Sequence, residues 1–296
     1  MVTNFHKTLV IVAIVTTFAS GCRSTKEYKK FAEAGNNFVT ATDTLLDAAS
    51  DITINTTSER ILSDRISCGD FKAGDEAAQI FIERYDKLSA SDKQRLELIK
   101  ELRKHNYFLQ NYFNKLIELA DSDSADETKT AVENIVSQLK ESGIKLVKLS
   151  SVKVDKLPSV TKIVLDARIR GALRDELEKR KFTIYQEITL QEKVLKAISN
   201  SIENDMEILR NFQEYRLVVK PIVQSESIDP DTWIQTRYKV MMQDADIISK
   251  INNASNTLTK FKGIFIDSIE GDITSKRLYK FIRKTNSFST LVSEQK

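Results

Sequence analysis

Residues 184–219 read IYQEITLQEKVLKAISNSIENDMEILRNFQEYRLVV and carry an apolar side chain at every seventh position. The repeat consists of Ile188, Leu195, Ile202 and Leu209, with Ile184, Ile198, Phe212 and Val219 on the companion positions. Such a heptad pattern places its apolar residues on one side of an α-helix, where they pack against a neighbouring helix. At about 1.5 Å per residue, the run from Leu173 to Val219 predicts a rod roughly 70 Å long, which Pro221 should end. A rod of that length indicates an elongated bundle.

Three other segments carry similar apolar stripes and are expected to form helices. The first covers residues 28–52, the second has its seam over 99–120, and the third has its seam over 240–265. Asn106 is the one strongly polar residue of the second seam. A buried Asn in such a seam can fix the register between helices, and a position at the wet edge of a bundle is the alternative. Asp229-Pro230 is typical of an N-cap followed by a first-turn proline.

Local capping signals predict breaks in these helices. A β-branched run precedes Thr56 and Glu59, which form a capping box, so we expect a joint and a new short helix there. Ser91 and Gln94 form a second capping box. It separates a helix expected over 75–88 from the helix that carries the second seam.

Glycine and proline are scarce, with 8 and 3 residues in a chain of 296. Few tight turns or hairpins can form from such a composition, so we predict an all-α fold, an elongated antiparallel helical bundle with long coiled-coil-like helices. The helix before Gly143 should fade there, and residues 144–157 fit neither the helical nor the strand period, which leaves a short strand pair as an alternative. This connector divides the expected N-terminal helical half, residues 22–150, from a C-terminal half, residues 151–296, and one continuous bundle is the alternative.

The first 22 residues have the form of an export signal. Lys7 supplies a positive start, residues 8–18 are a short apolar run, and Ala19-Ser20-Gly21-Cys22 places small residues before a cysteine. A membrane span needs about 20 apolar residues, so the run fits a cleaved signal. Its end resembles the lipobox of bacterial lipoproteins, although Ala19 stands where leucine is typical. The resemblance implies loss of residues 1–21 and diacylglycerol on the Cys22 thiol.

The same resemblance implies a location in the bacterial cell envelope. An Asp directly after the acylated cysteine favours the inner membrane in Gram-negative lipoproteins, and Arg23 stands at that place here. We therefore expect a lipid-anchored protein of the outer membrane that faces the periplasm. An ordinary secretory signal and an uncleaved anchor are the alternatives.

Charge in the mature chain is abundant and balanced. Removal of residues 1–21 leaves 275 residues with 44 basic and 42 acidic side chains. Nucleic acid is therefore not an expected partner, because a phosphate-binding surface normally has a clear basic excess. Cys68 is the one thiol besides Cys22, so we expect no intramolecular disulfide once Cys22 is acylated.

The residues do not form a recognisable catalytic or metal-binding set, so we expect no enzyme, no cofactor and no metal. His105 is the one histidine of the mature chain, and a zinc site needs three or four ligands. Residues 69–74 have the two-glycine spacing of a phosphate loop, but Asp75 and Glu76 follow where Lys and Ser or Thr should stand. Residues 121–126 lack the glycine of a calcium loop.

The final helix offers a candidate membrane or partner surface. Its cations are Lys276, Arg277, Lys280, Arg283 and Lys284, and they alternate with apolar residues such as Leu278 and Phe281. An amphipathic basic helix can lie on anionic lipid. The alternative is a helix docked into the bundle with a solvated basic face.

Together these patterns predict a lipid-anchored, non-catalytic helical protein that acts as an interaction or scaffold module. Its expected partners are the membrane, through the lipid, and another envelope protein or a second copy. A membrane-active protein, either pore-forming or bound to the lipid surface, is the alternative. An enzyme or a carrier of apolar ligands would need a deep pocket with convergent polar groups.

Overall fold

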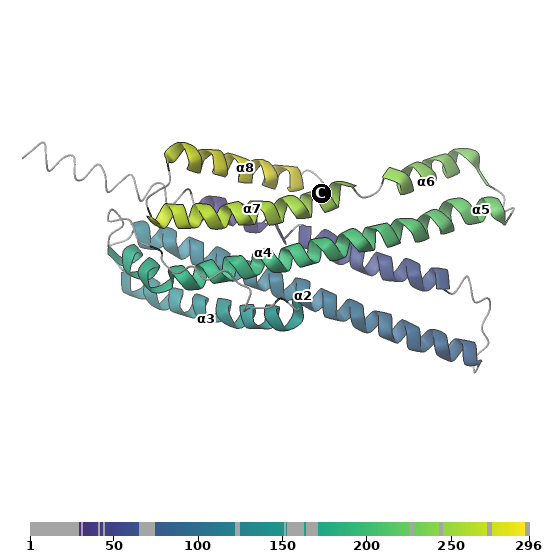
Figure 1. The fold of residues 1–296 in the computed structure, drawn as a ribbon, viewed down its shortest axis with the longest axis horizontal. Helices are drawn as coiled ribbons and strands as arrows, with labels where there is room; N and C mark the ends of the chain where they lie inside the picture. The colour runs from purple at the N-terminus through teal and green to yellow at the C-terminus, as the bar shows by residue number, and fades with distance from the viewer. Residues whose placement is uncertain are drawn as a thin grey trace, which may run out of the picture.

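The computed structural model describes residues 30, 32–40, 42–43, 45–64, 75–121, 125–150, 152, 163, 171–224, 228–242, 245–270 and 274–293. Within these ranges the regular structure is entirely helical and contains no strand, which confirms the all-α helical bundle (Figure 1). The first helical residues, 32–40, 42–43 and 45–64, are called the N-terminal segments. The labelled elements are α2 (Glu76–Asp121), α3 (Ala125–Ser150), α4 (Gly171–Glu214), the π-helix η2 (Tyr215–Val219), α5 (Lys220–Val223), α6 (Pro230–Met242), α7 (Ala245–Glu270) and α8 (Ser275–Ser293).

The long helix α4 is the axis of the bundle. Its 44 residues span about 66 Å, and α2, α3 and α7 all pack against it. The heptad residues Ile188, Leu195 and Ile202 are at most 1% exposed. The heptad pattern therefore predicts the buried face of α4 correctly up to Leu209, which is 2% exposed.

Polar contacts between helices show the direction in which each one runs. Thr57 bonds Asp92 and Asp43 bonds Asn106, so α2 is antiparallel to the N-terminal segments. Ser199 bonds Asn252 and Glu192 pairs with Lys262, so α7 is antiparallel to α4. Helices α3 and α4 instead run in the same direction, because Lys179 pairs with Glu133 near the start of both and Gly143 faces Glu187 further along.

One hydrophobic core connects the two halves of the chain. It contains buried residues from the N-terminal segments, α2, α3, α4, α7 and α8. Its aromatic centre joins Phe113 and Phe261, whose ring centroids are 5.2 Å apart in an edge-to-face arrangement, with Phe38 and Phe281 on the other sides of Phe261. Gly35 lies against these rings, since a Cβ there would sit 3.1 Å from both Phe113 and Phe261.

The two breaks expected from capping boxes are absent. Residues 45–64 are helical throughout, and Thr56 donates its hydroxyl to the carbonyl oxygen of Asp205 on α4 (3.2 Å) instead of capping a new helix. Helix α2 likewise runs unbroken through Ser91 and Gln94. The first capping box was misleading because Thr56 and Glu59 contact α4 and η2 instead, whereas Ser91 and Gln94 are exposed on the surface of an unbroken helix.

The ends of three helices also differ from the expectation. Helix α3 continues past Gly143 to Ser150, so the described residues 144–150 are helical and not strand. Pro221 does not end the long rod: it lies in the first turn of α5, where proline is tolerated, directly after the hydrogen-bond register has shifted in η2. The third seam is divided between α6 and α7. The N-cap at Asp229 is confirmed, because its Oδ2 accepts from the Thr232 N–H at 3.0 Å.

Candidate interaction surfaces

Helix α8 presents the predicted cations to solvent. Among the side chains of α8 that the structure describes, Leu278, Phe281 and Thr285 are buried, and the opposite face carries five exposed cations, Lys276, Arg277, Lys280, Arg283 and Lys284. The structure therefore brings the five residues together on one helix face. Arg277 forms an ion pair with Asp267 of α7 at 2.6 Å. In the described part of the chain, the other four form no ion pair.

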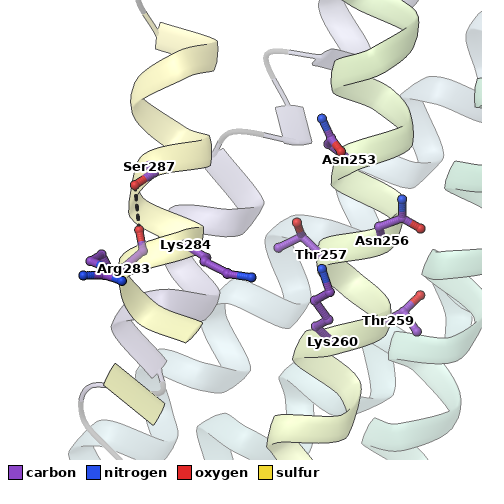
Figure 2. Close-up of a pocket in the computed structure, with 8 residues that line it drawn as sticks. All are labelled: Asn253, Asn256, Thr257, Thr259, Lys260, Arg283, Lys284 and Ser287. Atoms are coloured by element: carbon purple, nitrogen blue, oxygen red, sulfur yellow. Dashed lines mark hydrogen bonds between the residues drawn. The ribbon is translucent and has the colours of Figure 1, made fainter. Parts of the chain in front are cut away.

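A groove of about 580 Å³ separates α8 from α7. Its lining residues are Asn253, Asn256, Thr257, Thr259, Lys260, Arg283, Lys284 and Ser287. Figure 2 shows Lys284 directed from α8 toward α7, with Thr257 and Lys260 on the facing side of α7. The sequence prediction did not include Lys260 or the amide and hydroxyl side chains of α7, although the absence of any acidic residue from 249 to 266 was a signal for them.

A second surface lies at the end of the bundle formed by η2, α5 and α6 (Figure 1). We call it the tip surface, and its exposed apolar residues are Tyr215, Val219, Ile222, Val223, Ile234, Tyr238, Met241 and Met242. Val223 is 73% exposed, Met242 66% and Tyr238 64%. Sequence reasoning missed this surface and assigned Val219 to the buried seam, whereas Val219 is 40% exposed.

The spacing of these residues explains why they stay outside. Helix α6 folds back against α4 and η2, and the Trp233 indole N–H donates to the carbonyl oxygen of Val218 at 3.1 Å. Val218 and Val240 are buried. Ile234 and Tyr238 are one helical turn apart and lie on the face of α6 that points away from this contact. The described chain supplies no further helix to cover that face.

The interior of the bundle contains polar contacts between helices. Asn106 is fully buried, donates to Asp43 (3.2 Å) and accepts from Gln191 of α4. This places Asn106 in the core and not at a wet edge. His105 is also fully buried, and its Nε2 lies 3.0 Å from Oε2 of Glu187.

Two kinds of feature are absent from the described residues. They contain no group of three or more His, Cys, Asp or Glu side chains able to hold a metal ion, and none of their helices has both the length and the apolarity required to cross a membrane. Cys22, Cys68 and the glycine-containing segment 69–74 lie outside the described residues.

Comparison with known proteins does not assign this chain to a family. No protein-family model, no curated protein and no solved structure matches it.

Proposed function

We propose that this chain is a lipid-anchored helical protein of the bacterial envelope that acts as a non-catalytic interaction or scaffold module. Its partner is another envelope protein or a second copy of the chain. The lipobox-like residues 19–22 support the anchor, and Arg23 supports the outer membrane, facing the periplasm, as its location.

The tip surface is the observation that carries the interaction role. Burial of one large apolar side chain contributes about 1.5–3 kcal/mol relative to exposure, and eight such residues gather within residues 215–242. Large exposed apolar patches on soluble domains commonly mark protein or membrane contacts. Aromatic residues and methionine are also enriched at the centres of protein interfaces, and the tip surface contains Tyr215, Tyr238, Met241 and Met242.

The shape of the bundle suits this role. Helix α4 is a rod of about 66 Å, and the tip surface lies where that rod ends. Lys30 is the described residue nearest in sequence to Cys22, and it contacts Tyr279 of α8, a helix that lies toward the other end of the bundle. A protein held by a lipid on Cys22 would therefore present the tip away from its point of attachment.

Site-specific photocrosslinking in the native envelope tests the proposal. A photoreactive amino acid is placed at Tyr238 or Met242 in the tip surface, and as controls at Lys93 of α2 or Lys196 of α4, which are exposed elsewhere. We expect a discrete adduct from the tip positions and none from the controls, and an adduct of twice the chain mass would identify self-association. Equal adducts from all four positions, or none from the tip, would contradict the interaction role.

The anchor is tested separately. Metabolic labelling with palmitate should mark the wild-type chain and not the Cys22→Ala variant, because the thiol of Cys22 is the proposed acceptor. An unlabelled wild-type chain would contradict the lipoprotein assignment and leave the crosslinking result standing on its own.

A further inference from the structure

We propose that the exposed face of α7 and α8 docks on the phosphate headgroups of anionic phospholipids in the leaflet that holds the anchor. The choice of lipid as the occupant rests on the proposed lipid anchor at Cys22. The face itself is defined by described residues of α7 and α8 alone.

Positive charge is concentrated on this face. Residues 249–266 and 275–293 contain eight lysines and arginines and no aspartate or glutamate. Lys250 has an interaction of its own, Lys262 pairs with Glu192 at 2.5 Å, and Arg277 pairs with Asp267 at 2.6 Å. Within the described residues, Lys260, Lys276, Lys280, Arg283 and Lys284 form no ion pair. Since the whole chain has a formal charge of only +3, this face concentrates positive charge that the remainder of the molecule lacks.

The arrangement of these cations suits an array of phosphates. Lys276, Lys280 and Lys284 are four residues apart on one side of α8, so their stems are spread over about 12 Å of helix. Amide and hydroxyl groups of α7, at Asn256 and Thr257, line the adjoining groove together with Lys260. Ammonium and guanidinium groups form strong charge-assisted hydrogen bonds with phosphate oxygens. The face can therefore contact several headgroups at once.

Aromatic and apolar groups border the cations. Tyr279 is 52% exposed beside this stripe, and Lys30 lies over its ring, 4.0 Å from the centroid. Ile282 is half-buried on the same flank of α8 and lines a second groove with Tyr279. Tyrosine is favoured at the level of lipid headgroups, because its ring is apolar and its hydroxyl is wet. This combination is typical of a helix that lies in the interface plane.

The proposed anchor places this face close to lipid. Cys22 and Lys30 are eight residues apart, so their Cα atoms can be separated by at most about 28 Å. Lys30 contacts Tyr279, and Asn37 donates to Asn286 at 2.9 Å, so the N-terminal segments lie along α8. Electrostatic attraction in physiological salt is screened beyond about 8 Å. A tether of this length allows α8 to come within that distance of the leaflet. The anchor thus keeps anionic headgroups close to this face, whereas a soluble partner would have to reach it by diffusion.

Photoreactive lipids test the inference on the full acylated protein. The protein is reconstituted in vesicles that contain a photoreactive phosphatidylglycerol or, in a parallel sample, a photoreactive phosphatidylcholine, and lipid adducts are mapped by mass spectrometry. We expect adducts in residues 249–293 to be at least about fivefold more abundant with the anionic probe, since each cation near an anionic surface contributes on the order of a fivefold preference. They should be lost in about 1 M salt, where the screening length is near 3 Å.

A matched pair of variants shows which cations are responsible. Lys280→Glu with Lys284→Glu should reduce the adducts to the level of the neutral probe. Lys93→Glu with Lys100→Glu makes the same change in net charge on α2 and should leave them unchanged, because both lysines are exposed elsewhere on the bundle. Circular dichroism melts of both variants check that the fold is retained.

The remaining outcomes would overturn the inference. Equal adducts from the two probes, or adducts mainly on other helices, would show that the anchor alone brings the protein to the membrane. Binding to purified peptidoglycan through Lys280 and Lys284, without lipid adducts, would assign the face to the cell wall instead. If mass spectrometry finds no lipid on Cys22, the anchor fails, and the adduct map obtained by adding the chain to the same vesicles still decides the docking.

Discussion

Nε2 of His105 lies 3.0 Å from Oε2 of Glu187, and Gly143 of α3 leaves the space that this carboxylate occupies between α2 and α4. Three helices therefore meet at one polar contact. His105 is fully buried, and the Glu187 side chain is only 13% exposed. A buried imidazole without its partner would lose its hydrogen bond without gaining one from water, which costs free energy. The close packing of α3 at this contact therefore depends on glycine at position 143, because any side chain there would enter the space of the Glu187 carboxylate.

Gly143→Ala is expected to destabilise the bundle. A Cβ at Gly143 would overlap the Glu187 carboxylate, which must then move away from His105. The loss should be about 1–3 kcal/mol in the free energy of unfolding, larger than the gain of up to about 1 kcal/mol from replacing a helical glycine. Urea unfolding measures it. The matched control is Gly263→Ala in α7, where the new Cβ meets no atom within 4 Å. This substitution should raise the free energy of unfolding by about 0.5–1 kcal/mol.

Asn106→Ala is expected to lower the free energy of unfolding by about 2–4 kcal/mol. The substitution removes the acceptor of the Gln191 amide, which is 1% exposed, and the donor to Asp43. Buried polar groups left without hydrogen-bond partners destabilise the folded state, because they have lost their hydrogen bonds to water. The double variant Asn106→Leu with Gln191→Leu should recover the part of the loss that comes from the Gln191 amide, because that amide is removed as well, whereas Asp43 still lacks its donor. A double variant less stable than Asn106→Ala would show that this polar contact is needed for the packing itself.

The apolar stripes are the part of the fold that could be predicted from sequence. Leu102, Leu109 and Phe113 of the second seam are at most 1% exposed, as are Leu258 and Phe265 of the third. Heptad spacing predicts such burial because it depends on helical geometry, which is the same wherever the helix packs. The candidate cations of α8 could be predicted on the same basis, since buried Leu278 and Phe281 define the opposite face.

Features that depend on distant residues could not be predicted. Glu59 was expected to cap a helix, but it pairs with Arg216, which is 157 residues away in sequence. The tip surface was missed because Val219 follows the heptad pattern of α4, whereas the described chain supplies no helix to cover it. An apolar seam in the sequence shows which side of a helix is apolar. It does not show whether another helix is present to cover that side.

Arg216→Ala is expected to lower the free energy of unfolding by about 2–4 kcal/mol. Arg216 donates from Nε and from its terminal nitrogen to the two oxygens of Glu59, at 2.7 and 2.5 Å, and Glu59 is only 7% exposed. Removal of one partner leaves a buried carboxylate unpaired. Arg216→Lys should recover little of this loss, because lysine cannot form the two-pronged contact. Arg84→Ala is the control: Arg84 is half exposed in its pair with Asp64, so its loss should be below about 1 kcal/mol.

Asp43→Asn should change the pH dependence of stability. Burial raises the pKa of the Asp43 carboxyl above its ordinary value of 3.8, and the hydrogen bond from Asn106 opposes this only in part. An acid with a raised pKa in the folded state binds its proton more tightly there than in the unfolded chain, so its contribution to stability falls as the pH rises above 3.8. The variant should therefore gain stability over wild type as the pH is raised to 7.

Urea unfolding from pH 3 to pH 7 measures this difference. The two chains should be closest at the acid end, where Asp43 is protonated in both states. Asp51→Asn serves as the control, because Asp51 is exposed, whereas the charges that act on Asp43 are those of Arg103 and Asp47. A wild-type advantage that grows with pH would contradict the expectation, since it would mean that ionised Asp43 stabilises the fold.

The tip surface should tolerate charge without loss of stability. Ile234→Asp and Tyr238→Asp change residues that are 58% and 64% exposed, so the free energy of unfolding should shift by no more than about 0.5 kcal/mol. Crosslinking from Met242 in the same variants should fall at least about tenfold, because an unpaired charge buried in an interface opposes binding. Val240→Asp is the matched control on the same helix: Val240 is 4% exposed, so this change should destabilise by several kcal/mol. Strong destabilisation by Tyr238→Asp would instead show that the tip packs within the chain, and the interaction role would lose its main support.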